Sequence, residues 1–384
     1  MPTLIYCTGF EYGLAAPVNL GGGLCNAIGG TPVIQNTVKR TGSYALQIDA
    51  TAATEYFRVS VAGSPTCLVG RFYFNYHSIS TTGTRVFPAE TAGGLVWNFK
   101  FVTATAKLQA NISGSGAQLS GALSADTWYR IDFRFDCSGT TGTLDWQVDG
   151  VDQTQSTKTS MTPSAFIRFG LGEDTNVTTC TMYYDDVAIS ITSGDYPIGA
   201  GAVIGLRPNA DGTHNNAANI MEDSAGNDID GSTYFAFDKL DEDPWITTRD
   251  ADYVRQTATG AANYCEINFA DTAQTTINGV RAILQWSGSG YAANNGSTYI
   301  LDSDAQSTTV YSGDMSEPTA AFYSSIQVAA PAGGWTPAYV NSLKCRFGYS
   351  TDSTTDPYWL AIILEVDGVM VAPSAWTPKV IMVM

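Results

Sequence analysis

The run Leu144-Asp145-Trp146-Gln147-Val148-Asp149-Gly150-Val151 largely alternates apolar and polar residues and ends in Asp-Gly between two valines. A period of two indicates a half-buried strand. Asp-Gly between β-branched residues favours a tight hairpin, because glycine accepts the positive φ of the turn. The same four residues recur as Val366-Asp367-Gly368-Val369, after the apolar run 360–364 and Glu365. This echo predicts a hairpin late in each half of the chain, and hence two β domains in tandem.

Other runs extend the pattern outward from the first hairpin. Tyr129-Arg130-Ile131-Asp132-Phe133-Arg134-Phe135-Asp136 places an apolar residue at every second position, which predicts a strand with Phe133 on its buried face. Short strands separated by Gly and Ser indicate a jelly-roll sandwich. We therefore predict an all-β fold of two tandem antiparallel β-sandwich (jelly-roll) domains with very little helix.

A length of 384 residues suits two such domains. We assign residues 1–193 to the first domain, 194–219 to a Gly/Pro/Asn-rich linker and 220–384 to the second. The run 203–206 is an alternative first strand of the second domain. One short helix is expected at 336–343, where Thr336 can cap the end and Pro337 suits the first helical position.

Composition limits the partners of the chain. Charged residues make up 14% of the sequence, against roughly 25% in an average domain. The net charge of −17 would repel nucleic acid and anionic membranes. No stretch approaches the length of about 20 apolar residues that spans a bilayer. We therefore predict neither a nucleic-acid nor a membrane partner.

The cysteines are dispersed and form no C-x-x-C pair, which argues against a zinc site or a disulfide framework. Cys7 with Cys25 is the one pairing left open. Reduced thiols, together with an N-terminus that lacks the features of a signal peptide, predict synthesis in a cytoplasm.

Catalytic signatures are sparse. His77 and His214 are the two histidines, and neither lies in the local context of a Ser-His-Asp relay. No phosphate loop or metal-hydrolase motif is present. A carboxylate pair for glycoside cleavage stays open, because acids are plentiful and their geometry is not visible in a sequence. The chain is predicted not to be an enzyme.

Three segments carry a resemblance to known families: Gly9-Phe10-Glu11-Tyr12-Gly13, the run 40–48 (RTGSYALQI), and Tyr184-Asp185-Asp186-Val187-Ala188-Ile189. Over residues 4–192 the chain resembles the laminin-G-like and carbohydrate-binding-module jelly rolls. In several such modules an acid of the first segment and one on the last strand hold a structural calcium ion. The resemblance thus implies Ca²⁺ at Glu11 and Asp186, with Asp185 as a substitute, against the alternative of ordinary surface acids.

Exposed tryptophans are candidates for stacking on a sugar ring. Trp128 and Trp146 are the predicted ligand-binding residues, with Trp128 preferred because its neighbour Tyr129 belongs to the buried face.

The second half is similar to a segment of bacteriophage virion proteins. The similarity covers residues 205–384 and rests on Trp245-Ile246, the run 250–254, the run 277–282, and the turn Trp335-Thr336-Pro337-Ala338-Tyr339-Val340-Asn341-Ser342-Leu343. It implies a non-enzymatic structural component of a tailed-phage virion, such as a head decoration, head fibre or tail fibre, made in the host cytoplasm.

Such a protein is expected to assemble as a homo-oligomer, for example a trimer, and to contact capsid or tail subunits. The alternative function is a carbohydrate-binding adhesion module, on a virion or secreted, which recognises a host-surface glycan. A secreted polysaccharide hydrolase is disfavoured by the missing signal peptide and catalytic signature.

Overall fold

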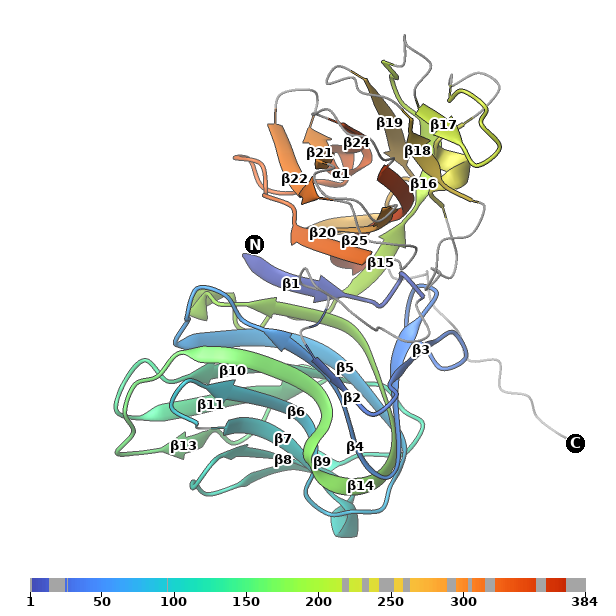
Figure 1. Ribbon diagram of the computed structural model, residues 1–384. Coiled ribbons are helices and arrows are strands. Elements are labelled where there is room, and N and C mark those ends of the chain that lie inside the picture. The colour runs from blue at the N-terminus through green and yellow to red at the C-terminus, as the bar shows by residue number, and fades with distance from the viewer. Residues whose placement is uncertain are drawn as a thin grey trace, which may run out of the picture.

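The computed structural model describes residues 2–13, 25, 27–94, 96–215, 221–229, 235–241, 252–257, 263–288, 295–302, 306–314, 322–349 and 357–370. These residues are mostly β-strand, with one α-helix and three short 3-10 turns among them. The prediction of an all-β, antiparallel fold with very little helix is confirmed (Figure 1). No helix in this part of the chain is long and apolar enough to cross a membrane.

The first sandwich contains the strands β1 to β14 (Figure 1). Their bounds are β1 Leu4–Thr8, β2 Ala27–Gly29, β3 Val33–Gln35, β4 Ala45–Ser60, β5 Cys67–Ile79, β6 Thr84–Thr91, β7 Val96–Val102, β8 Lys107–Ile112, β9 Gln118–Ala122, β10 Tyr129–Asp136, β11 Gly142–Val148, β12 Val151–Asp152, β13 Ser156–Lys158 and β14 Phe166–Ser190.

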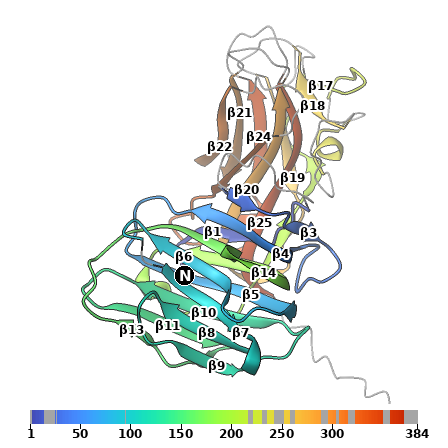
Figure 2. The same ribbon diagram turned by 60° about the horizontal axis from the view of Figure 1, so that its bottom comes forward.

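Two long strands, β4 and β14, run through both layers of this sandwich. The first part of β14 pairs with β6 and its last part pairs with β5, while β4 pairs with β14 along most of its length. One layer, called here the β5 layer, holds β5, β10, β11 and the last part of β14. The other, the β6 layer, holds β6 to β9 and the first part of β14 (Figure 2).

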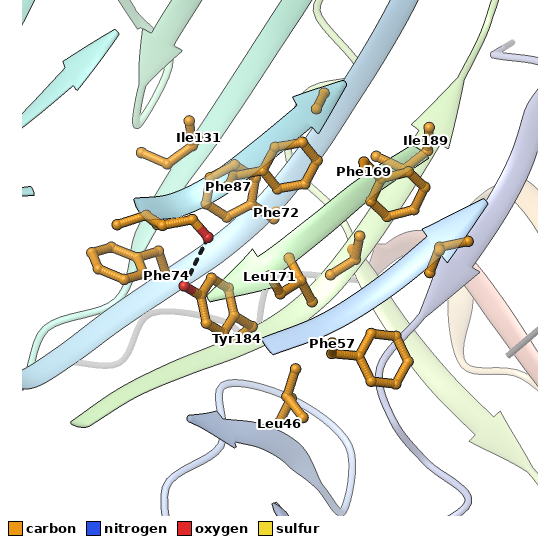
Figure 3. Packing of buried hydrophobic residues seen from close by; sticks show 14 of the residues in the cluster. Leu46, Phe57, Phe72, Phe74, Phe87, Ile131, Phe169, Leu171, Tyr184 and Ile189 are labelled. Atoms are coloured by element: carbon orange, nitrogen blue, oxygen red, sulfur yellow. Dashed lines mark hydrogen bonds between the residues drawn. The ribbon is translucent and has the colours of Figure 1, made fainter. Parts of the chain in front are cut away.

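Aromatic rings fill the space between the two layers. The rings of Phe72 and Phe87 stack with centroids 4.9 Å apart, and Phe133 lies 4.8 Å from Phe87. Tyr184 lies among them, and its hydroxyl donates to the carbonyl of Val86 at 2.8 Å (Figure 3). Phe133 is fully buried, as its place in the alternating run predicts.

The two Val-Asp-Gly-Val sequences adopt different structures. In the first, Asp149 and Gly150 have φ of 50° and 81° and form the turn between β11 and β12, as predicted. The prediction is wrong for the second. Residues 366–369 lie inside one long strand, β25 (Pro357–Met370), where Gly368 pairs with Ile277.

The second sandwich packs a six-stranded sheet on a five-stranded one. The six strands are β15 Ala202–Leu206, β17 Met221–Asp223, β18 Val254–Gln256, β20 Gln274–Gly288, β23 Phe322–Gln327 and β25. The five are β16 Pro208–Asp211, β19 Tyr264–Phe269, β21 Asn295–Asp302, β22 Gln306–Asp314 and β24 Lys344–Tyr349. Strands β15 and β16 fall within the range predicted as a linker, and β15 contains the alternative first strand 203–206.

The short helix is α1 (Pro337–Asn341). Its start follows the prediction, since Pro337 occupies the first turn and the backbone N–H of Tyr339 donates to the Thr336 hydroxyl at 3.1 Å. The indole of Trp335 packs edge-on against Tyr339, with centroids 5.5 Å apart.

The sandwiches share an apolar boundary. Ile283 and Ile363 point from β20 and β25 away from the second core, and both belong to the hydrophobic cluster of the first sandwich. Strand β1 lies at this boundary, between the two units (Figure 1). All seven cysteines are buried free thiols, so Cys7 and Cys25 are not paired.

Candidate functional site

The three acids predicted as metal ligands lie together at the boundary of the sandwiches. Glu11 follows β1, and Asp185 and Asp186 lie on β14, which pairs with β1. All three are buried, with at most 3% of each residue exposed. Burial raises the pKa of Glu11 to about 8. Burial, and then the neighbouring Asp186 carboxylate, raises the pKa of Asp185.

The turn at residues 40–43 wraps closely around Glu11. The backbone N–H of Ser43 donates to Glu11 Oε2 at 2.8 Å. Gly42 has a φ of 59°, and a Cβ at this position would lie 2.0 Å from Glu11 Oε1. Only glycine therefore fits between the turn and the carboxyl group.

The donors around the two aspartates do not fit a calcium ion. Asp185 Oδ2 accepts from the backbone N–H groups of Arg40 and Thr41 at 2.9 and 3.2 Å. Asp186 accepts from the Thr41 hydroxyl at 2.7 Å and from the Arg40 guanidinium. A calcium ion needs about six to eight oxygen ligands, whereas these oxygens face N–H and O–H donors. Among the described residues, no group of three His, Cys, Asp or Glu side chains could hold a metal ion.

Further buried charges cross the boundary, and no sequence pattern predicts their pairing. Arg71 of β5 forms an ion pair with Asp367 of β25, and both side chains are 0% exposed. Glu365 accepts from the Thr8 hydroxyl at 3.0 Å and lies 3.7 Å from Arg281 Nη1. These residues join the sandwiches. Asp367 lies in the repeated Val-Asp-Gly-Val sequence and Arg281 in the run 277–282, but neither pattern predicts a buried ion pair.

A second group of residues lies on the outer face of the β5 layer. Pairing of Tyr129 with Phe74 brings Trp128 beside Asn75, and Asn75 pairs with Tyr183. Tyr129 packs against the core, and alternation of side chains therefore predicts that Trp128, which directly precedes β10, faces outward. Trp128 and Tyr183 are both half-buried. We call Trp128, Asn75 and Tyr183 the Trp128 face.

Asn75 is the residue at the centre of the Trp128 face. It is 3% exposed, and its Oδ1 atom has no hydrogen-bond partner in the described part of the chain. Most buried polar atoms in folded proteins do have such a partner. An amide acceptor without a donor, flanked by two aromatic residues, is suited to a ligand that carries hydroxyl groups.

Polar groups border this face. His77 Nδ1 lies 2.9 Å from Asp126 Oδ1, and both side chains are well exposed. Burial, followed by the charges of Asp49 and Asp126, raises the pKa of Tyr183. The edge of the face therefore offers carboxylates and an imidazole for hydrogen bonds to a ligand.

Trp146 is a core residue, so it is not available to stack on a ligand. It is 1% exposed, its ring lies 5.4 Å from that of Phe99, and its Nε1–H donates to the carbonyl of Thr154 at 2.9 Å. The alternating run places Leu144 and Trp146 on the buried face of β11, where Trp146 pairs with Phe133 of β10.

The second histidine, His214, forms hydrogen bonds within the second sandwich. His214 Nε2 lies 2.9 Å from Asp211 Oδ2, and His214 Nδ1 accepts from the backbone N–H of Glu266 at 3.1 Å. Both ring nitrogens are thus engaged with residues of the second sandwich. Within the described part of the chain, neither histidine forms a hydrogen bond with a serine or cysteine side chain.

A cavity of about 380 Å³ lies beside β1, between residues 2–4, Asn278, Gly279 and the segment 327–335. Its lining is mainly small, with alanines, prolines and glycines. Two of its polar side chains are engaged elsewhere, since Asn278 donates to Asp367 at 3.0 Å and Gln327 accepts from the Cys7 thiol at 3.9 Å. The Trp128 face is therefore the better candidate site.

No family model and no curated protein matches the sequence. Weak structural similarities exist. The Cellulose induced protein Cip1 is 14% identical with a TM-score of 0.36, and the match covers 49% of this chain and 97% of that one. Domain 4 of AbnA, a GH43 extracellular arabinanase from Geobacillus stearothermophilus in complex with arabinotriose, is 14% identical with a TM-score of 0.35, over 49% and 92% of the chains. Trypanosoma rangeli sialidase in complex with sialic acid is 12% identical with a TM-score of 0.33, over 47% of this chain and 32% of the sialidase. TM-scores at this level assign neither a family nor a function.

Proposed function

We propose that this protein is a carbohydrate-binding module whose ligand rests on the Trp128 face. The observation that carries the proposal is the buried Oδ1 of Asn75, which lacks a donor and lies between Trp128 and Tyr183. Sugars have both an apolar surface and hydrogen-bond donors, which match the aromatic residues and the amide oxygen of this face. Their C–H faces pack on aromatic rings, and their hydroxyl groups donate to amide oxygens.

In this proposal the protein binds without catalysis. Both histidines are paired with carboxylates, and the predicted acids are buried beneath the second sandwich rather than on the Trp128 face. The role in a virion, the contacts with capsid or tail subunits and the homo-oligomeric state stay predictions. Cryo-electron microscopy of an assembled particle would test them.

The binding test uses the full chain on an array of neutral oligosaccharides. Trp128→Ala and Tyr183→Ala are expected to weaken the best signal at least about tenfold, which corresponds to about 1.4 kcal/mol. Leu119→Ala is the control, because Leu119 is an exposed apolar residue on the other layer. A Trp128→Ala protein that binds as well as Leu119→Ala would contradict the proposal.

Asn75→Leu separates binding from folding. Replacing an unpartnered buried amide by an apolar side chain of similar size is neutral or stabilising for the fold. The variant should therefore keep or raise its melting temperature while it loses the glycan. Retained binding by a folded Asn75→Leu protein would show that the amide does not contact the ligand.

A further inference from the structure

The β6 layer presents a second outer face, on the opposite side of the first sandwich from the Trp128 face. Its cationic side chains come from five adjacent strands, and we call them the basic face: Arg58 (β4), Arg168 (β14), Arg85 (β6), Lys100 (β7) and Lys107 (β8). All five are partly exposed. Such a concentration of cations is notable in a chain whose net charge is −17.

Strand register places these cations on one surface. Arg85 pairs with Lys100 across β6 and β7, and Arg168 pairs with Glu90 across β14 and β6. The neighbours of Lys100 along the strand are Phe99 and Phe101, which belong to the core. Alternation therefore directs Lys100 and its cross-strand partner Arg85 outward.

A shallow depression lies within the basic face. Its lining includes three guanidinium groups, from Arg58, Arg85 and Arg168, and one carboxylate, from Glu90. Gly170, which pairs with Arg58, contributes no side chain, and Pro88, Val96 and Phe169 complete the lining. The lining thus carries three cationic groups and one carboxylate, and this carboxylate of Glu90 forms an ion pair with Arg168.

Amide groups continue this surface beyond the depression. Asn98 pairs with Pro88 on one side and with Asn111 on the other. Trp97 and Phe99 are core residues, so Asn98 belongs to the outer face. It is 2% exposed, and its Oδ1 has no hydrogen-bond partner within the described residues. This is a second buried acceptor that lacks a donor, independent of the charges.

We infer that the basic face binds a carboxylate-bearing polysaccharide, a polyuronate. Arginine side chains match the planar geometry of a carboxylate and bind it with two parallel hydrogen bonds. The hydroxyl groups of the same sugar supply the donor for Asn98. The layout across five strands suits an extended chain, with the acid groups over the cations and the hydroxyls over the amides. This inference does not depend on the Trp128 face.

Polygalacturonate and its fully methyl-esterified form are the probes, since the two differ in charge but share a backbone. The full-length protein should bind polygalacturonate, with an affinity that falls as salt is raised. The esterified polymer should bind at least about tenfold more weakly. Equal binding of the two polymers would overturn the inference, and so would the absence of binding to polygalacturonate.

Variants with a matched control test whether polygalacturonate binds at the basic face. Arg168→Gln, and separately Arg58→Gln with Lys100→Gln, should each lower the affinity for polygalacturonate at least about tenfold. Arg134→Gln is the control, because Arg134 on the β5 layer is also ion-paired, with a side chain 32% exposed against 35% for Arg168. An equal loss in Arg134→Gln would overturn the inference, because it would reflect overall charge. Melting temperatures identify any variant that fails to fold.

Two further measurements distinguish the basic face from the Trp128 face, and a polyuronate from a second copy of this chain. Trp128→Ala should leave polygalacturonate binding unchanged, and a loss in this variant but not in Arg168→Gln would overturn the basic face while supporting the Trp128 face. Sedimentation velocity tests a second copy of this acidic chain as occupant. Self-association that Arg168→Gln abolishes, without any polyuronate binding, would assign the face to that contact instead.

Discussion

The phenyl ring of Phe133 lies within 4.5 to 6.2 Å of four other phenyl rings, measured between centroids. Phe133→Ala should lower the free energy of unfolding by about 3–5 kcal/mol, because it removes buried apolar surface and leaves a cavity. Urea denaturation measures the change. Ile167→Ala is the control, since Ile167 is 38% exposed and should change stability by less than about 1 kcal/mol. Equal effects of the two substitutions would contradict the assigned core.

Glu11 gives the fold a pH dependence of its own. Its pKa is about 8 in the folded protein against 4.5 as its ordinary value, chiefly because of burial. The folded state therefore holds this proton more tightly than the unfolded chain. The resulting stabilisation is complete below pH 4.5 and is lost as the pH rises towards 8, with a slope of roughly 1 kcal/mol per pH unit.

Glu11→Gln tests this dependence, because glutamine keeps the shape and does not titrate. The stability of the variant relative to the native protein should rise between pH 5 and pH 8, as measured by urea unfolding at a series of pH values. A constant difference over this range would mean that Glu11 is already ionised in the folded protein at pH 5.

Arg40 supplies positive charge where the resemblance implied calcium. Its guanidinium binds Asp186 and lies 3.4 Å above the ring of Tyr73. Arg40→Gln should lower the melting temperature, since it removes this charge from a buried carboxylate. The native protein should melt at the same temperature with calcium and with chelator. A chelator-dependent melting temperature, abolished by Asp186→Ala, would instead restore the calcium prediction.

At the scale of the strand, the two Val-Asp-Gly-Val sequences require glycine for different reasons. Gly150 needs its positive φ for the turn, and a Cβ there would meet only the end of the Arg130 side chain. Gly368 lies within a paired strand, where a Cβ would lie 2.1 Å from the backbone oxygen of Thr276. Gly150→Ala should cost about 1–2 kcal/mol. Gly368→Ala should lower the free energy of unfolding by more than this, because the backbone of β20 or β25 must move to make room for the methyl group. Denaturant unfolding of both variants gives the comparison, and a smaller cost at Gly368 would contradict the pairing of β25.

At the scale of the whole molecule, buried ion pairs couple the sandwiches. Asp367→Ala leaves Arg71 buried without its carboxylate, which should cost about 3–5 kcal/mol. The same loss weakens the contact between the sandwiches, so a single calorimetric transition should divide into two. Asp145→Ala is the control, because its partly exposed pair with Arg134 should contribute at most about 1 kcal/mol. A single transition in both variants would show that the apolar boundary alone couples the two units.

Local chemistry was sufficient for much of this fold. Alternation along 129–136 determined which face of β10 is buried, and Thr336 with Pro337 determined where the helix begins. The same period of two predicted an outward direction for Trp128. In each case, residues that are close in sequence also make the contacts that stabilise the local structure.

Tertiary structure decided the rest. Asp149-Gly150 forms a turn, whereas Asp367-Gly368 stays in a strand because Arg71 and Asn278, distant in sequence, satisfy the buried carboxylate. The orphaned amides of Asn75 and Asn98 and the gathering of five cations arise only when separate strands are paired. Such groups are assembled by strand register between distant segments, and no local pattern of residues encodes which donor or charge will lie opposite.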